Sequence, residues 1–223
     1  MPRISAYYAA NNLYISMQLL ARDTSAKFAN EHMQEATRYK DRDTLLKDAV
    51  KRASQLAGCI CEFGVYSGRS LKLVAVSAPS KEIHGFDSFE GLPLDWRPGF
   101  KKGAFKTTMP KLRQPNVRLH VGWFDATLPP FLAQLREPIS LVHIDCDLYS
   151  STKCVLEGIT PYLAPEAILV FDEYFNYPGW ERHEYKTLEE TVRSGFFNIE
   201  YLGYNVCGQQ VMLRAIKHEH SAL

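Results

Sequence analysis

Residues 141–152 of the chain read LVHIDCDLYSST. They begin as an apolar run typical of a buried strand, end in the carboxylates Asp145 and Asp147, and pass into a stretch typical of a helix. A second apolar run, residues 168–171, ends in Asp172 and Glu173. Ligands of open α/β sheets bind beyond the carboxyl ends of the strands, so two neighbouring parallel strands would bring these four acids together.

Such a cluster of carboxylates needs a compensating charge. Close carboxylates repel one another, and their pKa values rise unless a cation shares the site. Oxygen ligands favour a hard ion such as magnesium or calcium over zinc. The sequence therefore predicts a metal site at this edge of the sheet.

Composition limits the class of protein. The chain has 223 residues, which suits one α/β domain, and its 46% hydrophobic and 23% charged residues are typical of a globular protein. A net charge of +1 without a basic block argues against a nucleic-acid partner. No apolar run approaches the ~20 residues of a membrane span, and the N-terminus has no secretory-signal pattern. We expect a cytoplasmic protein with no membrane partner.

The cysteines predict no cross-link. Their number is odd, none forms a CxxC pair, and their neighbours are apolar, so buried free thiols are expected rather than disulfides or a zinc site. They are Cys59, Cys61, Cys146, Cys154 and Cys207.

Strand and helix patterns alternate after residue 58, which predicts a Rossmann-like α/β fold with a mostly parallel sheet and helices on both faces. The last two strands are joined by too few residues for a crossover helix, so they should form an antiparallel hairpin. The seven expected strands are residues 59–63, 82–86, 117–121, 141–145, 167–171, 198–202 and 210–214. The helices expected between them are residues 71–76, 130–135, 149–163 and 187–193.

The remaining segments are assigned to the same single domain. Residues 1–57 are expected to form two or three extra N-terminal helices, the last over 43–56 with Asp43 as its N-cap, and residues 58–216 the main domain. The helices would cover one face of the sheet, or act as a lid or an oligomer contact. Residues 93–110 have no clear period, and such long irregular loops are often functional, so they are a second candidate lid.

A glycine-containing turn follows the first strand. Glu62 ends that strand, and Gly64 and Gly68 precede a helix whose N-terminus offers free N–H groups. The spacing differs from the G-x-G-x-x-G of dinucleotide folds, which disfavours an NAD-dependent oxidoreductase. Ser67 and Ser70 belong to the same candidate site, although a turn made only for packing is the alternative.

Two later strand ends extend this site. Asp87 ends the second strand, where a carboxylate can accept both ribose hydroxyls, with Ser88 and Phe89 beside it. After the third strand, Gly122, Trp123 and Asp125 could border an adenine ring. The alternatives are that Asp87 is only a helix cap and that Trp123 is only a core aromatic residue. Together these positions favour an adenosine-type cofactor.

Four motifs in this order resemble the macrocin O-methyltransferase family. They are EFGVYSG at 62–68, GFDSFEGLP at 85–93, HIDCDLY at 143–149 and DEY at 172–174. The resemblance implies a class I enzyme that uses S-adenosyl-L-methionine and Mg²⁺ to methylate a hydroxyl of a small molecule, often a sugar of a natural product. It also implies a seven-stranded sheet with an antiparallel end.

The resemblance assigns roles by position. The metal would be held by Asp145, Asp172 and Glu173. Asp147 would be the general base, and Asp145 would also be a catalytic residue. Family members often have two aspartates where this chain has Asp172 and Glu173. A metal ion that binds two neighbouring substrate oxygens lowers the hydroxyl pKa and fixes its orientation, which suits this chemistry.

The histidines and the loop aromatics could each have a structural or a functional role. His143 lies two residues before Asp145 and is expected to be a hydrogen-bonded core residue rather than a second base. His183 and Glu184 follow an aromatic loop, residues 174–180, which could form a substrate wall. The aromatics of residues 174–180 could stack on a sugar or pack against the sheet edge. Two other functions stay open, a catechol or phenol O-methyltransferase and a non-catalytic nucleotide-binding module. A homo-oligomer is also possible.

Overall fold

The computed structural model describes residues 11–217. Its centre is one eight-stranded sheet in the order β1-β7-β8-β6-β5-β2-β3-β4, in which β8 alone runs antiparallel to its neighbours β6 and β7. The predicted mostly parallel sheet with an antiparallel C-terminal hairpin is therefore confirmed. The strands are β1 Thr37–Tyr39, β2 Cys59–Phe63, β3 Ile83–Asp87, β4 Val117–Val121, β5 Ile139–Ile144, β6 Leu163–Phe171, β7 Phe197–Asn205 and β8 Val211–Lys217.

One strand was not expected. β1 lies within the N-terminal region that was predicted to be wholly helical, and it pairs in parallel with the edge strand β7, Arg38 opposite Tyr204. It contains only three residues, too few to show an alternating pattern. The sheet therefore has eight strands rather than seven.

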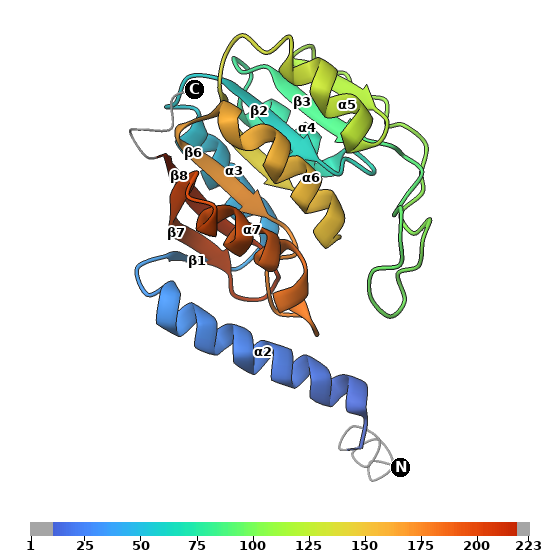
Figure 1. Cartoon of the computed structure of the whole chain (residues 1–223), viewed down its shortest axis with the longest axis vertical. Coiled ribbons are helices and arrows are strands. Elements are labelled where there is room, and N and C mark those ends of the chain that lie inside the picture. The colour runs from blue at the N-terminus through green and yellow to red at the C-terminus, as the bar shows by residue number, and fades with distance from the viewer. Residues whose placement is uncertain (1–10, 218–223) are drawn as a thin grey trace.

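Helices cover both faces of the sheet, as predicted (Figure 1). α5, α6 and α7 pack on one face and α3 and α4 on the other, while α2 lies apart from both layers (Figure 1). Their bounds are α2 Leu13–His32, α3 Arg42–Ala53, α4 Arg69–Ser77, α5 Phe124–Leu132, α6 Tyr149–Ile159 and α7 Glu184–Arg193, with short 3₁₀ turns η1 Thr160–Tyr162 and η2 Trp180–Arg182.

Strand side chains alternate between two cores. In β2, Cys61 and Phe63 pack on the side of α5 and α6, whereas Ile60 packs with α3 and α4. In β5, Val142 packs on the side of α5 and α6, and Leu141 packs with α3 and α4. Because both faces of the sheet centre are covered, every residue of β2 and of β5 is buried.

Several predicted boundaries were wrong by a few residues. α3 begins at Arg42 because Asp41, not Asp43, accepts the Thr44 N–H as the N-cap. α5 begins at Phe124, so that both of its prolines lie inside the helix rather than at its start. β6 begins at Leu163 instead of residue 167, and α6 is correspondingly shorter.

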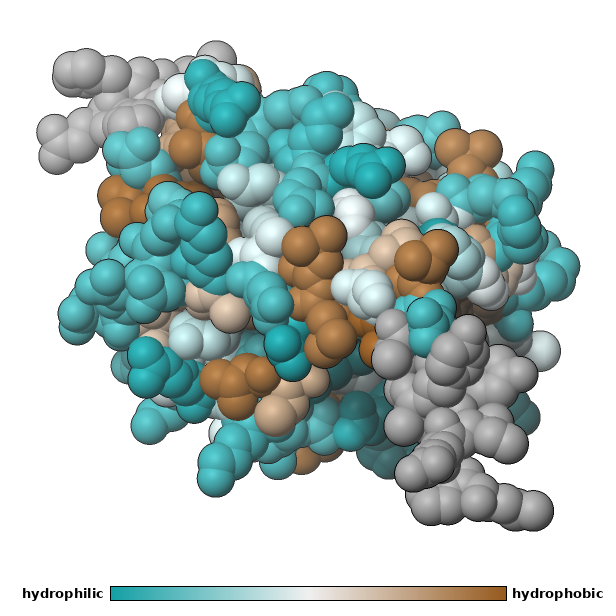
Figure 2. Space-filling view, turned by 90° about the horizontal axis from the view of Figure 1, so that it is seen from below, coloured by the Kyte–Doolittle hydropathy of each residue, from teal (hydrophilic) through white to brown (hydrophobic). Residues whose placement is uncertain are grey.

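α2 does not cover a sheet face. Its buried residues are small, Ala21, Ser25 and Ala29, and the Ser25 hydroxyl accepts the Asn176 N–H at 2.8 Å. Its first half exposes apolar side chains, including Leu13 and Leu20, which are 79% and 64% exposed. Figure 2 shows the molecule from this side, with apolar patches interrupting the hydrophilic surface.

The cysteines are free thiols, as predicted. Cys59, Cys61 and Cys146 are buried, but Cys154 is half-buried and Cys207 is exposed in the turn between β7 and β8, so the expectation of burial fails for these two. No helix within residues 11–217 has the length and apolarity needed to cross a bilayer.

Candidate active site

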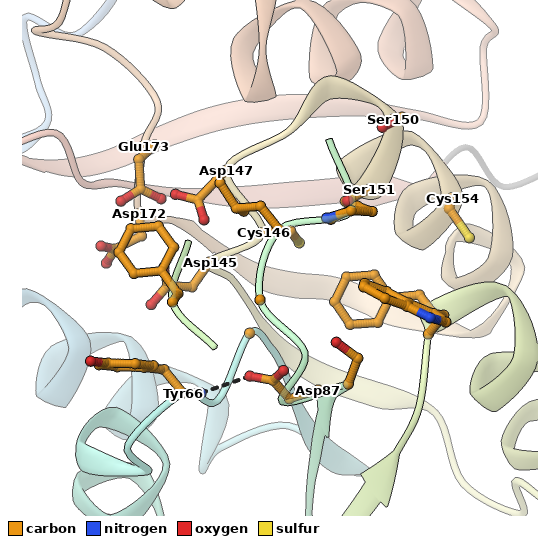
Figure 3. A pocket seen from close by; sticks show the side chains of 18 of the residues that line it. Tyr66, Asp87, Asp145, Cys146, Asp147, Ser150, Ser151, Cys154, Asp172 and Glu173 are labelled. Atoms are coloured by element: carbon orange, nitrogen blue, oxygen red, sulfur yellow. Dashed lines mark hydrogen bonds between the residues drawn. The ribbon is translucent and has the colours of Figure 1, made fainter. Parts of the chain in front are cut away.

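The parallel register of β5 and β6 brings the acidic strand ends together. Ile144 pairs with Phe171, and the next residue along each strand is Asp145 and Asp172. Ligand atoms of Asp145, Asp147 and Glu173 all lie within 4.8 Å of one another. Asp172 lies with Asp145 in a second such group, whose third member is His143 rather than Glu173. Figure 3 shows the four acids on one side of a pocket.

The backbone at this site is unusual. Asp147 has φ of 62°, in the left-handed region that residues with a Cβ seldom adopt. The tight turn lets the Leu148 N–H reach the Cys146 carbonyl at 2.6 Å, and α6 begins directly afterwards. Such local strain is concentrated at functional sites. The carboxylates of Asp145 and Asp147 lie beside each other at this turn.

Burial and mutual repulsion raise the pKa values of most of these carboxyls. Burial first, and Asp172 second, raise the pKa of Asp145 to about 7. Burial and Asp145 raise the pKa of Asp147, and burial and Asp172 raise that of Glu173. Burial and acidic neighbours therefore both disfavour the charged form of these three carboxyls.

Asp172 differs because protein groups neutralise it. Its Oδ1 is 2.9 Å from Nε of Arg42 and 3.4 Å from Nε2 of His143, and its Oδ2 accepts a bond from Gln210. Burial alone would raise the pKa of Asp172, but the hydrogen bond from His143 and the charge of Arg42 outweigh it and lower that pKa.

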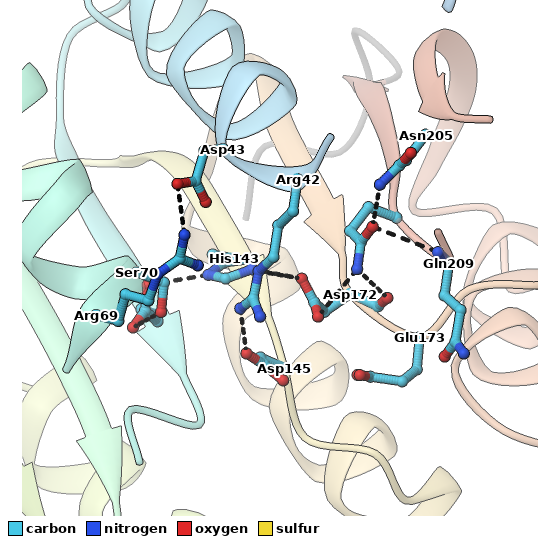
Figure 4. A network of polar contacts seen from close by, with 12 residues as sticks. Arg42, Asp43, Arg69, Ser70, His143, Asp145, Asp172, Glu173, Asn205 and Gln209 are labelled. Atoms are coloured by element: carbon cyan, nitrogen blue, oxygen red, sulfur yellow. Dashed lines mark hydrogen bonds and ion pairs between the residues drawn. The ribbon is translucent and has the colours of Figure 1, made fainter. Parts of the chain in front are cut away.

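Arg42 is the site residue that sequence reasoning missed. It is the first residue of α3, and its guanidinium also contacts Asp145 Oδ2 at 2.6 Å (Figure 4). Nothing local identifies it, because its partners lie more than 100 positions away in the chain. It lines the pocket beside the acids and supplies part of the positive charge they need.

The residues present fit a hard divalent cation. Glu173 Oε2 is buried without a hydrogen-bond partner, which is costly for a carboxylate. Two overlapping groups have ligand atoms within 4.8 Å, one containing Asp145, Asp147 and Glu173, the other His143, Asp145 and Asp172. An oxygen-rich site of this kind suits Mg²⁺ or Ca²⁺.

His143 is a core residue, the alternative that was favoured from sequence. It is fully buried, with Nδ1 2.9 Å from Glu62 Oε2. Burial would lower the pKa of His143, but its hydrogen bonds to Asp172 and Glu62 outweigh burial and raise it to about 10. The imidazolium therefore links the first strand of the site to the acidic cluster.

The pocket continues from the acids toward the ends of β3 and β4. It is a cavity of roughly 630 Å³, a size typical of small-molecule sites. Asp87 stands at the base of this part, where its Oδ2 accepts the N–H groups of Val65 and Tyr66 at 2.9 and 2.7 Å. Its Oδ1 accepts the Phe89 N–H at 2.7 Å. Asp87 thus fixes both loops that border the pocket, as Figure 3 shows for Tyr66.

The predicted cofactor residues divide between the wall of the pocket and its support. The ones that line the pocket are Gly64, Asp87, Ser88, Trp123 and Asp125. The ones outside its lining are Glu62, Ser67, Gly68, Ser70, Phe89 and Gly122. Glu62 is buried and accepts a bond from the Ser70 hydroxyl at 3.0 Å, so this pair supports the turn from below.

Glycine is required at position 64 for a structural reason. Gly64 has φ of +93°, and a Cβ there would lie 1.8 Å from the Asp145 carbonyl oxygen. Only glycine lets the turn after β2 approach the turn after β5 so closely. The lining residues that the sequence did not indicate, besides Arg42, include Tyr66, Leu92, Phe105, Phe124, Ser150 and Ser151.

Comparison with known proteins agrees with this geometry. The family described as a methyltransferase domain, Methyltransf_24, matches residues 61–174, about half of the chain. The chain belongs to this methyltransferase family. The matched segment runs from β2 to the residue after Glu173, so it contains the predicted cofactor turn and all four acids.

One similar protein is named for the methylation of a rhamnosylated natural product. The chain is 27% identical over 156 residues to an 8-demethyl-8-(2,3-dimethoxy-α-L-rhamnosyl)-tetracenomycin-C 4'-O-methyltransferase of Streptomyces olivaceus. That alignment covers 59% of this chain and 56% of the relative, so the chain matches little more than half of it.

Solved structures show the same fold. The calicheamicin methyltransferase CalS11 is 29% identical, with a TM-score of 0.63 over 77% of this chain and 78% of that one. A second CalS11 structure is described as a TDP-rhamnose 3'-O-methyltransferase. The O-methyltransferase NovP, 18% identical with a TM-score of 0.61 over 79% and 80%, shows the fold alone. The predicted enzyme class, an S-adenosylmethionine-dependent O-methyltransferase, and the resemblance to macrocin O-methyltransferases are confirmed.

Proposed function

We propose that the chain methylates a hydroxyl of a sugar or glycoside of a natural product, with S-adenosyl-L-methionine as donor and Mg²⁺ as the metal. The observation that carries this is the pocket itself. One part is bordered by Asp87 and Trp123, the other by the carboxylates of Asp145 and Asp147. The sugar O-methyltransferases among the similar proteins support a saccharide as the acceptor class.

The donor would lie over the turn after β2. In this arrangement Asp87 faces the ribose, and Ser88, Trp123 and Asp125 border the nucleoside. Glu62, Ser67, Gly68, Ser70, Phe89 and Gly122, which do not line the pocket, hold the surrounding turns in place.

The metal would be held by Asp145, Asp172 and Glu173, with Arg42 shifted from its bridging position. A bound Mg²⁺ supplies charge that lowers the acceptor hydroxyl pKa and a fixed point for two neighbouring oxygens. Asp147 would accept the hydroxyl proton.

Calorimetric titration with S-adenosylhomocysteine, with Mg²⁺ and then with chelator, tests the donor site. We expect binding in both conditions, and methyl transfer to rhamnosides only when Mg²⁺ is present. Binding of NAD or other nucleotides in place of S-adenosylhomocysteine would contradict the assignment. Full activity in the presence of chelator would contradict only the metal.

We also propose that the enzyme self-associates through the first half of α2. Leu13, Tyr14, Met17 and Leu20 are all at least half exposed there, an unusual concentration for one helix. Light scattering measures the molar mass in solution. We expect a larger mass for the wild-type chain than for a Leu13→Ser/Leu20→Ser variant. A monomeric wild type would contradict this part.

A further inference from the structure

A cluster of unsatisfied polar atoms lies beside the acidic site. Among residues 11–217, six buried side-chain polar atoms have no hydrogen-bond partner. Arg214 supplies one of them, and the other five belong to a single group that we name the orphan cluster: Trp96 Nε1, Glu173 Oε2, Tyr177 Oη, His183 Nδ1 and Glu184 Oε1. Buried polar groups are nearly always satisfied, so such a concentration points to an absent partner.

The members of the orphan cluster contact one another. The rings of Trp96, Tyr177 and His183 lie 6.0 to 6.3 Å apart, centroid to centroid. Glu184 follows His183 in the chain, and its other carboxylate oxygen accepts the Glu173 N–H at 3.0 Å. The cluster is therefore continuous with the acids of the proposed metal site.

The loop aromatics of residues 174–180 separate into two kinds. Tyr174 and Trp180 are core residues, because the Tyr174 hydroxyl is 2.6 Å from that of Tyr201 and Trp180 Nε1 donates to Thr24. Tyr177 is equally buried, at 1% exposed, yet its hydroxyl has no protein partner. Packing alone explains Tyr174 and Trp180 but not the hydroxyl of Tyr177.

A lid covers the cluster. The chain from Leu92 to Ala104 forms a loop closed on itself, since the Leu92 N–H donates to the Ala104 carbonyl and that of Trp96 to Phe100. Trp96 and Arg97 of this loop contact Tyr177, with the Arg97 guanidinium 4.7 Å from the Tyr177 ring, while Leu92 and Pro93 line the pocket. This loop lies within the irregular stretch 93–110 singled out from the sequence, apart from its first residue. Displacing the loop would move Trp96 away and uncover Tyr177, while the hydrogen bonds within the loop could stay intact.

We propose that the orphan cluster is the subsite for the acceptor sugar, under the Leu92 to Ala104 lid; this rests on the proposed function. The cluster mixes donors, the Trp96 N–H and the Tyr177 hydroxyl, with an acceptor on Glu184, and His183 can serve as either. A ring with several hydroxyls needs this mixture, and the flat faces of Trp96 and Tyr177 suit its C–H surface. A catechol has two oxygens and would leave most of these atoms unpaired.

The Tyr177→Phe variant tests this with little risk to the fold. Its hydroxyl bonds to no protein group, so its removal should leave the thermal midpoint unchanged or slightly raised. With S-adenosylhomocysteine and Mg²⁺ present, we expect about tenfold weaker binding of methyl α-L-rhamnopyranoside and TDP-rhamnose, the cost of one lost hydrogen bond. Affinities for S-adenosylhomocysteine and Mn²⁺ should stay within about twofold.

Tyr174→Phe is the matched control, because its hydroxyl has a protein partner. It should lower the thermal midpoint and leave rhamnoside affinity unchanged. Equal rhamnoside affinity in Tyr177→Phe and wild type would overturn the proposal. So would a wild type that binds S-adenosylhomocysteine and 3,4-dihydroxybenzoate but neither rhamnoside. An enzyme that fails to bind S-adenosylhomocysteine at all would instead reject the proposed function.

Discussion

The guanidinium of Arg42 donates to a carboxylate oxygen of Asp145 at 2.6 Å, although 103 positions separate the two residues. The same guanidinium contacts Asp172 at 2.9 Å. An arginine from the N-terminal region thus holds two of the carboxylates that the resemblance assigns to a metal. The helix start that carries it is fixed by the Asp41 cap.

Removing this charge should strengthen metal binding. In Arg42→Gln we expect Mn²⁺ affinity to rise roughly fivefold, the scale of one partly exposed ion pair. Calorimetry without cofactor measures it directly. Arg69→Gln is the control, since Arg69 pairs with Asp43 outside the pocket lining and should leave the affinity unchanged. Weaker Mn²⁺ binding in Arg42→Gln would show that Arg42 positions the ligands instead of competing for them.

Asp87 should govern cofactor affinity. In Asp87→Asn the amide cannot accept all three backbone N–H groups as well as a carboxylate does, and both loops loosen. We expect S-adenosylhomocysteine affinity to fall at least about tenfold. The control is Asp95→Asn, at an exposed lid residue paired with Lys101. If the two variants bound S-adenosylhomocysteine equally well, Asp87 would have no role in the donor site.

His143 should be needed for stability. Replacing it by Leu leaves the buried Glu62 without its histidine partner and takes one contact from Asp172. Breaking a buried charged pair on one side costs about 3 kcal/mol of unfolding free energy. Urea denaturation at pH 7 measures this, with the exposed His32→Gln as control. A loss below about 1 kcal/mol would mean that Glu62 finds another partner or is neutral.

The neighbouring histidines His84 and His120, whose ring nitrogens lie 3.0 Å apart, should make the fold sensitive to acid. Burial first, and the neighbouring His84 second, lower the pKa of His120 to about 4, while Glu82 acts in the opposite direction. His120 therefore binds a proton more readily when unfolded. Its contribution to stability is present above pH ~6.5, its unfolded pKa, and is lost as the pH falls toward 4.

The variant His120→Phe isolates this effect. The new ring keeps the stacking on Phe86, whose centroid lies 4.3 Å from that of His120. Thermal midpoints measured from pH 7.5 to 4.5 should fall further in the wild type than in the variant. Parallel curves for the two proteins would show that His120 does not titrate in this range.

The sequence by itself determined the sheet and the meeting of the acids. Apolar runs of strand length, each followed by a helical stretch, impose a parallel sheet, and acids placed directly after such runs must emerge at its carboxyl edge. Asp145 and Asp172 are adjacent for that reason. The antiparallel hairpin followed from a connection too short for a crossover. Each of these inferences uses only local pattern and chain length.

Tertiary structure alone decided the rest. The roles of Arg42, of strand β1 and of Gly64 depend on partners far away in the chain, and no local periodicity records such pairs. The same holds for Tyr174 and Tyr177, two tyrosines of one loop with equal burial but different hydroxyl environments. A residue's neighbours in sequence set its backbone preference, whereas the packing of distant segments sets which of its atoms remain available to a ligand.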